Sequence, residues 1–225
     1  MAHVIAVPIG EQTLAHSHAF LSAQAEGRSE TAQILIDRVD GMTDDMLQLF
    51  LVQPTQFVRL SGGQQRVIDF AVSTAKKASH ALTRQIFKKS KPQELAPLAQ
   101  LMKEQMWEAE TANDNKPRIC ITIPPQLAQD FEQAKALCDE GKAQENITLL
   151  TSVMDRIADE IIDNFFVAPT EHVKMGFVIS KALNVGVEGS RKAIHAVTNK
   201  VMKELDEEAL VAFFNHFGQV VLERP

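Results

Sequence analysis

The chain has no tyrosine, one tryptophan and two cysteines among its 225 residues. Cys120 and Cys138 lack the Cys-x-x-Cys spacing of zinc and redox sites, so we expect two reduced core thiols and a cytoplasmic location. No uncharged apolar run approaches the roughly 20 residues that cross a bilayer, which predicts no membrane insertion. Residues 1–10 have no basic segment, and we expect no signal peptide there.

The composition is that of an ordinary globular protein, with 45% hydrophobic and 23% charged residues. Helical periodicity dominates the sequence, so the predicted fold class is mainly α: a multi-helix, bundle-like protein with at most a small minor β-sheet. Two helices are indicated most clearly, over 64–89 and 144–166. Their apolar stripes are Val67, Ala71, Ala75, Ala78, Leu82 and Ile86 in the first helix and Ile147, Leu150, Met154, Ile157 and Ile161 in the second.

Strand signals are few, and they fall at the ends and in the middle of the chain. The apolar runs 119–123 and 219–222 predict strands, which 4–7 and 57–60 can join in a small sheet. The polar, turn-forming stretch 111–117 is the predicted linker between two helical halves, 1–112 and 118–225.

Charge is distributed unevenly along the chain. The formal net charge is −6, yet residues 70–93 contain six Lys and Arg and no acidic residue. At about 100° per residue, five side chains of the predicted basic helix 64–91 share one face. This face, within 76–91, is a candidate site for anions or nucleic acid, and its residues are Lys77, His80, Arg84, Lys88 and Lys91.

Residues 179–197 resemble the helix-turn-helix pattern of DNA-binding proteins, with Gly186 at the turn. The resemblance implies that a recognition helix begins near Glu188–Ser190 and points Ser190, Arg191 and His195 at DNA; Lys192 beside them is a further candidate for binding nucleic acid. Lys192 stands where the pattern prefers an apolar residue, so a plain helical hairpin with its turn at Gly186 is an alternative interpretation.

Acidic residues recur every four positions near the middle of the second strong helix. Glu160 and Asp163 resemble the E-x-x-D motif of all-α nucleotide pyrophosphohydrolases, which implies metal-dependent hydrolysis of a phosphorylated small molecule. A solvated helix face explains the same spacing. The low-ranking metal-ligand candidates are Asp155, Asp159, Glu160 and Asp163.

One further motif is excluded because the other motifs of its family are missing from the sequence. The run LSGGQQRV at 60–67 resembles the signature motif of ATP-binding-cassette ATPases. That family also requires a phosphate loop and a Walker-B strand, and the sequence has neither. We interpret the run as a turn in which Ser61 caps the following helix.

Three function classes stay open. The sequence favours a non-enzymatic regulatory protein that acts through a protein–protein interface. That interface joins it either to a protein partner or to further copies of itself in an oligomer. The alternatives are a DNA-associated regulator, using 179–197 or the basic helix, and the all-α hydrolase. We expect no cofactor, and no catalytic constellation stands out.

Overall fold

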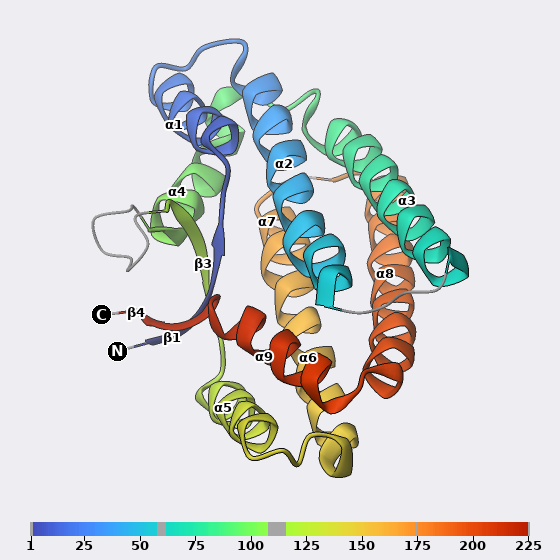
Figure 1. Cartoon of the computed structure of the whole chain (residues 1–225). Helices are drawn as coiled ribbons and strands as arrows, with labels where there is room; N and C mark the ends of the chain where they lie inside the picture. Colours follow the sequence, from blue (N-terminus) through green and yellow to red (C-terminus); the bar gives the residue numbers. More distant parts are fainter. Residues whose placement is uncertain (1, 58–61, 108–115, 174, 225) are drawn as a thin grey trace.

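The computed structural model describes residues 2–57, 62–107, 116–173 and 175–224, without the side chains of Gln64, Val67, Ala71, Val178 and Ala193. It confirms a mainly α protein with a small antiparallel sheet (Figure 1). The strand order is β2-β3-β1-β4, and the bounds are β1 Ala2–Pro8, β2 Met106–Trp107, β3 Arg118–Thr122 and β4 Val221–Arg224. Ile5 lies opposite Ile121 of β3 and Val221 of β4, so the first strand occupies the interior of the sheet.

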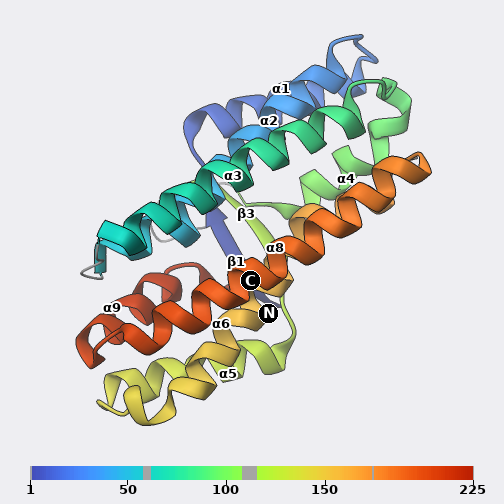
Figure 2. The same cartoon turned by 90° about the vertical axis from the view of Figure 1, so that its right-hand side faces the viewer.

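The helices form an inner group around the sheet and an outer pair. The inner group comprises α1 Glu11–Ala25, α2 Thr31–Leu47, α4 Ala96–Gln105, α5 Pro125–Asp139, α6 Ile147–Ile162, the short α7 Ala168–Glu171 and α9 Glu207–Gly218. The outer pair is α3 Gly62–Phe87 and α8 Phe177–Glu204. The outer helices run alongside each other on the side that faces the viewer in Figure 2.

The main core lies where the sheet meets α6, α5 and α9. Leu150, Met154, Ile157 and Ile161 are buried on α6, as the spacing of its apolar residues predicts. They join Ile5, Ile119, Phe131 and Phe214 in one hydrophobic cluster. Strands from the first and the last parts of the chain therefore share one core.

The outer helices contribute little to this core. Among the side chains that the structure describes, α3 buries Thr83 and Phe87, and α8 buries Leu183 and Met202. Ala78, which the predicted stripe of 64–89 places in the core, is exposed. The prediction for Ala78 is wrong because α3 faces α2 through polar side chains, described below.

Residues 179–197 form neither a helix-turn-helix nor a hairpin. α8 is one continuous helix of 28 residues, and Gly186 lies inside it. In α3 the helix ends at Phe87, so Lys88 and Lys91 do not continue its face as predicted; Lys91 instead precedes a 3-10 turn over Pro92–Leu95.

The other differences lie at the ends of elements. The short strand β2 was not predicted. Ser61 and residues 111–115, the proposed cap and most of the proposed linker, lie outside the described residues, as do 58–60 of the expected strand 57–60. No helix in the described part of the chain is long and apolar enough to span a membrane.

Candidate functional site

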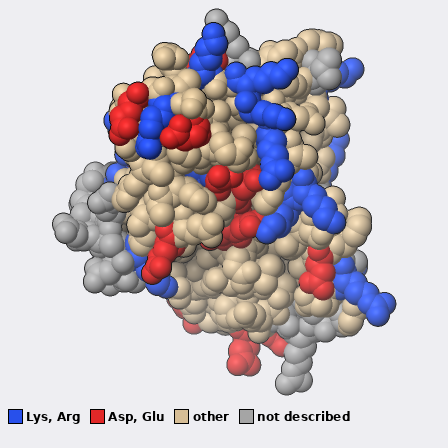
Figure 3. All heavy atoms as spheres, turned by 90° about the horizontal axis from the view of Figure 1, so that it is seen from above, with Lys and Arg blue, Asp and Glu red and all other residues tan. Residues whose placement is uncertain are grey.

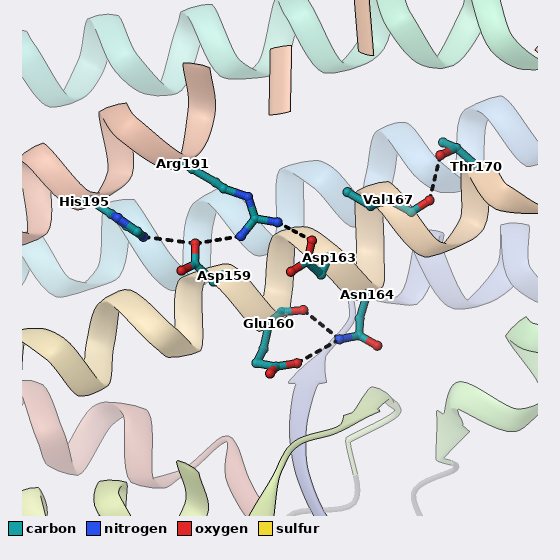
Figure 4. A network of polar contacts seen from close by, with 8 residues as sticks. All are labelled: Asp159, Glu160, Asp163, Asn164, Val167, Thr170, Arg191 and His195. Atoms are coloured by element: carbon teal, nitrogen blue, oxygen red, sulfur yellow. Dashed lines mark hydrogen bonds and ion pairs between the residues drawn. The ribbon is translucent and has the colours of Figure 1, made fainter. Parts of the chain in front are cut away.

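Helices α6 and α8 meet through a row of polar side chains, which we call the α6–α8 seam (Figure 4). Asp159 Oδ1 accepts a hydrogen bond from Arg191 Nη1 at 2.8 Å and lies 3.0 Å from His195 Nε2. The other nitrogen of the Arg191 fork, Nη2, donates to Asp163. One turn further along, Asn199 Nδ2 donates to Asp155 Oδ2 at 3.0 Å. Residues four apart on one helix thus face residues four apart on the other.

The seam is only half-buried, but burial still shifts the pKa values of two carboxyl groups, those of Asp155 and Glu160. Burial raises the pKa of the Asp155 carboxyl, and the charge of His195 and the hydrogen bond from Asn199 only partly oppose this. Burial also raises the pKa of Glu160, whose Oε2 accepts from Asn164 Nδ2 at 3.2 Å. At Asp155 and Glu160, hydrogen bonds therefore only partly offset the cost of removing the charged carboxylate from water.

This arrangement changes the interpretation of the predicted metal ligands. Asp155, Asp159 and Asp163 do lie on one face, but that face meets a guanidinium, an imidazole and an amide. The hydrolase hypothesis requires a second acidic helix in their place. Among the described residues, no three His, Cys, Asp or Glu side chains are placed to hold a metal ion.

The residues predicted to read DNA fall into two groups. Ser190 and Lys192 are exposed on α8, while the Arg191 side chain is only 20% exposed and is bound by two carboxylates. In this arrangement Arg191 serves the α6–α8 seam, and it does not project from the surface as a recognition residue would.

A second polar row, the α2–α3 seam, joins the other outer helix to the inner group. Lys76 Nζ lies 2.5 Å from Asp44 Oδ2, and His80 lies between two aspartates, 3.7 Å from Asp40 and 3.5 Å from Asp44. Thr43 and Ser79 share a hydrogen bond of 3.2 Å beside them. His80 therefore lies in this seam and not on the exposed cationic face that the sequence predicts.

The remaining predicted cations are all exposed, as is the neighbouring Lys89, and we call this set the basic face: Lys77, Arg84, Lys88, Lys89 and Lys91. Arg84 is close enough to the half-buried Asp40 to lower its pKa, but burial of that carboxyl dominates and raises the pKa overall. Lys77, Lys88 and Lys89 form no ion pair with another described residue. Viewed from above, Lys and Arg side chains gather in a band, with Asp and Glu side chains beside it (Figure 3).

Large apolar side chains are exposed on the same two outer helices. Phe70 of α3 is 72% exposed, and on α8 Phe177 is 82% and Val185 67% exposed. Phe177 and Val185 lie with Lys181, Ala182 and Gly186 along one open stretch of the α8 surface. Apolar exposure next to charge is typical of a surface that binds another molecule.

The two cysteines are not placed for nucleophilic chemistry. Burial raises the pKa of the Cys120 and Cys138 thiols to about 11 in each case. Because the thiolate is the reactive form, both side chains are inert core residues at neutral pH.

The spacing of polar residues in the sequence indicates both seams, although neither was predicted from it. Arg191, His195 and Asn199 repeat the four-residue spacing of Asp155, Asp159 and Asp163, and Asp40 with Asp44 matches Lys76 with His80. Complementary rows at equal spacing indicate two helices that pack against each other. The exposure of Phe70, Phe177 and Val185 has no such signal, because a helical apolar residue is expected to be buried.

No protein family, curated protein or solved structure matches this chain.

Proposed function

We propose that the protein is a non-enzymatic interaction protein that binds an acidic protein partner through the basic face and the adjoining outer surface of α8. The observation that carries the proposal is the separation of charge. Residues 70–93 contain six Lys and Arg and no acidic residue, although the chain has a net charge of −6, and all of the six except the seam residue Lys76 belong to the exposed basic face. Such a patch attracts an oppositely charged surface and accelerates its association.

The exposed apolar side chains support a protein partner. A stable protein interface combines a desolvated apolar centre with a polar rim, and the exposed Phe177 next to Lys181 on α8 offers both kinds of side chain. A nucleic-acid groove instead needs cations that follow the phosphates, with aromatic side chains between them for base stacking. Here the phenylalanine that lies between Lys77 and Lys88 in the sequence, Phe87, is buried.

The charge of the face also favours a different protein over a second copy. A twofold dimer places the same patch of each copy in contact. Joining two basic faces would bring the same lysines and arginine of both chains together, which is unfavourable. The proposal therefore specifies an acidic partner of a different kind.

A charge-reversal variant tests the proposal. Lys77→Glu, Arg84→Glu and Lys88→Glu together reverse the basic face, and Lys103→Glu, Lys142→Glu and Lys203→Glu give an equal change of net charge elsewhere. Proteins cross-linked to the wild type in cells are identified, purified and titrated against all three forms. We expect acidic partners whose affinity falls with salt and is reduced at least about tenfold by the first triple variant only.

Two results would contradict the proposal. One is equal binding of the captured partner by both triple variants. The other is salt-sensitive binding of duplex DNA in an anisotropy titration, lost in the first variant while no protein partner depends on the same residues. That second result would assign the face to nucleic acid.

A further inference from the structure

The second half of the chain repeats the order of elements in the first. In the first half, β1 is followed by two helices, a π-helical turn at Gln48–Val52 and the outer helix α3. In the second half, β3 is followed by two helices, a π-helical turn at Asp163–Val167 and, after the short α7, the outer helix α8. Each half then closes with one helix and one strand, α4 with β2 and α9 with β4. A glycine with positive φ joins the first two helices of each half, Gly27 and Gly141.

The residues of the two halves correspond as well as the elements do. These glycines are 114 positions apart, and equivalent residues from α2 onward are 115 positions apart. The clearest matching runs are FLVQPT at 50–55 with FFVAPT at 165–170, and KKASHALT at 76–83 with RKAIHAVT at 191–198. Thr55 and Thr170 make the same hydrogen bond, donating from Oγ1 to the carbonyl oxygens of Val52 at 2.7 Å and Val167 at 2.6 Å. Self-similarity at a fixed spacing indicates a structural unit that is present twice.

The two seams and the sheet follow the same correspondence. The equivalent seam side chains are Asp40 with Asp155, Asp44 with Asp159, Lys76 with Arg191 and His80 with His195. In the sheet, Met106 lies opposite Ile119, and their equivalents Val221 and Ile5 also lie opposite each other. β1 and β3 pair antiparallel between these edge strands, so exchanging the halves leaves the strand order unchanged. A twofold axis through the sheet has this property, as in a symmetric dimer.

The outer helices also repeat exposed side chains, which packing does not explain. The exposed pairs are Arg66 with Lys181, Phe70 with Val185, Lys77 with Lys192 and Lys88 with Lys203. At about 100° per residue, the first three positions of each helix fall within about 40° of one another. Each helix thus carries an outer stripe, which we define as these three positions, with one large apolar side chain between two cations.

Acidic residues of these surfaces are not repeated. Asp69 is exposed at the edge of the α3 stripe, and Glu188 is exposed on the α8 stripe. Their equivalents, Asn184 and Ser73, are uncharged. The features that both stripes keep are therefore the two cations and the apolar side chain between them, and exposed residues that are kept in this way indicate binding.

The two outer stripes lie on neighbouring helices, α3 and α8 (Figure 2). We infer that they are two equivalent halves of one surface and that the acidic partner is a homodimer, whose subunits each place the same acidic segment on one stripe. This inference rests on the proposed function and specifies the symmetry of the partner. A single acidic segment would leave one stripe in contact with water, whereas a twofold partner covers both, and its carboxylates complement the repeated cations.

The apolar position of the stripes favours a protein partner over duplex DNA, which also has local twofold symmetry. Phe70 is 72% and Val185 67% exposed. A valine cannot stack on a base, so the property that both stripes share is apolar surface and not an aromatic ring. A protein interface buries such surface within a polar rim.

Single lysine variants test each stripe separately. Lys77→Glu and Lys192→Glu reverse equivalent charges, one on each stripe, and the control is Lys103→Glu, at an exposed position of α4 whose equivalent, Gly218, is uncharged. All three positions are exposed, so the variants should fold, which circular dichroism and the thermal midpoint check before binding is measured. The probe is a labelled peptide of glutamates with interspersed leucines. It is used singly and as a dimer, in which a disulfide joins two copies through flexible glycine–serine linkers.

By fluorescence anisotropy at low salt, we expect the dimeric peptide to bind the wild type at least about tenfold more tightly than the single peptide, because its second contact is intramolecular. Lys77→Glu and Lys192→Glu should each reduce this advantage to a factor of about two, and Lys103→Glu should leave it unchanged. Native mass spectrometry of the wild type should find a pair of single peptides bound to each chain.

The outcomes separate the two proposals. If the dimeric peptide has no advantage, or if Lys192→Glu leaves that advantage unchanged, the inference fails, while the proposed function stands as long as the basic-face triple variant weakens the natural partner. If the triple variant leaves the natural partner unaffected, the proposed function fails, even where the dimeric peptide keeps its advantage. Tighter binding of a palindromic DNA duplex than of the dimeric peptide, lost in both Lys77→Glu and Lys192→Glu, would overturn the inference in favour of nucleic acid.

Discussion

At the scale of single residues, the two glycines inside α8 show how much of this helix is exposed. Gly186 and Gly189 have ordinary helical backbones, and a Cβ atom at either one meets nothing within 4 Å. Glycine in a helix interior costs about 0.5–1 kcal/mol relative to alanine. We expect Gly186→Ala and Gly189→Ala each to raise the free energy of unfolding by about that amount in urea titrations. A loss of stability in either variant would show that the position packs against something else in solution.

Arg38 is the most unusual buried side chain. It lies on α2 at 5% exposure, and its Nε and Nη2 atoms are buried without a hydrogen-bond partner among the described residues. Burial lowers its pKa to about 10, which still leaves the group charged at neutral pH. Desolvating a charge without compensation is costly, so the site disfavours the residue that occupies it.

Replacing this arginine is therefore expected to stabilise the protein, which is unusual for a substitution at a buried position. Arg38→Met keeps much of the side-chain volume and removes the buried charge, so we expect the free energy of unfolding to rise by about 1–3 kcal/mol. Chemical denaturation measures it, and Arg66→Met, at an exposed position of α3, is the comparison that should change little. A less stable Arg38→Met protein would mean that the guanidinium has an acceptor in solution.

At the scale of elements, the attachment of α8 to α6 depends on Arg191. Its guanidinium bridges the half-buried Asp159 and the exposed Asp163; without it Asp163 loses its ion-pair partner and Asp159 keeps only His195. We expect Arg191→Met to lower the free energy of unfolding by about 1–2 kcal/mol. The matched control is Lys192→Met at the next, exposed position, which should stay within about 0.5 kcal/mol of the wild type. Equal effects of the two would show that the seam does not hold α8.

Replacing each of two aspartates of the same seam by asparagine should change the stability of the protein in opposite directions. Asp159→Asn removes the charge between Arg191 and His195 and should destabilise the protein at pH 7. Asp155 is different because burial raises its pKa, so its carboxylate costs stability at neutral pH. Asp155→Asn keeps an oxygen that can accept from Asn199, and should raise stability at pH 7 by less than about 1 kcal/mol, since the group is partly solvated.

The raised pKa of Asp155 also determines how the stability gained in Asp155→Asn depends on pH. A raised folded-state pKa means that the folded protein binds the proton more tightly than the unfolded chain does. The stability that Asp155 contributes is thus fully present below its ordinary pKa and lost as the pH rises through its raised value. Denaturation midpoints between about pH 3 and pH 7 should show the advantage of Asp155→Asn growing with pH. An advantage that shrinks over this range would contradict the cause assigned to the shift.

The sequence predicted some elements well and others poorly, for identifiable reasons. The spacing of Leu150, Met154 and Ile157 predicted the buried side of α6 because an apolar stripe has one stable location. The helix-turn-helix resemblance placed a turn at Gly186, which is helical, since the contacts of Arg191 and Met202 on the same helix outweigh the local preference of glycine. Of the candidate site, the cations of 76–91 were found from charge alone, whereas the seams required knowing which helices are neighbours.

At the scale of the whole molecule, each outer helix is held to an inner acidic helix by a polar seam, α3 to α2 and α8 to α6. Both outer helices bury few apolar side chains. Local opening costs least where few buried contacts are lost. We expect amides of α3 and α8 to exchange with deuterium before those of α6 and β1, and the difference to widen near 1 M salt, which screens the seams. Peptide-level exchange measured by mass spectrometry tests this. Uniform exchange across the helices, at both salt concentrations, would contradict it.

The position of β1 has a consequence for how the protein is made. β1 precedes the other strands in the sequence, yet it lies between β3 and β4, and Ala2 pairs with Arg224. Its apolar residues Val4 and Ile5 thus have no strand to pair with until β3 has been synthesised, and no second neighbour until synthesis reaches β4. Until then, the unpaired apolar strand makes the nascent chain prone to aggregate.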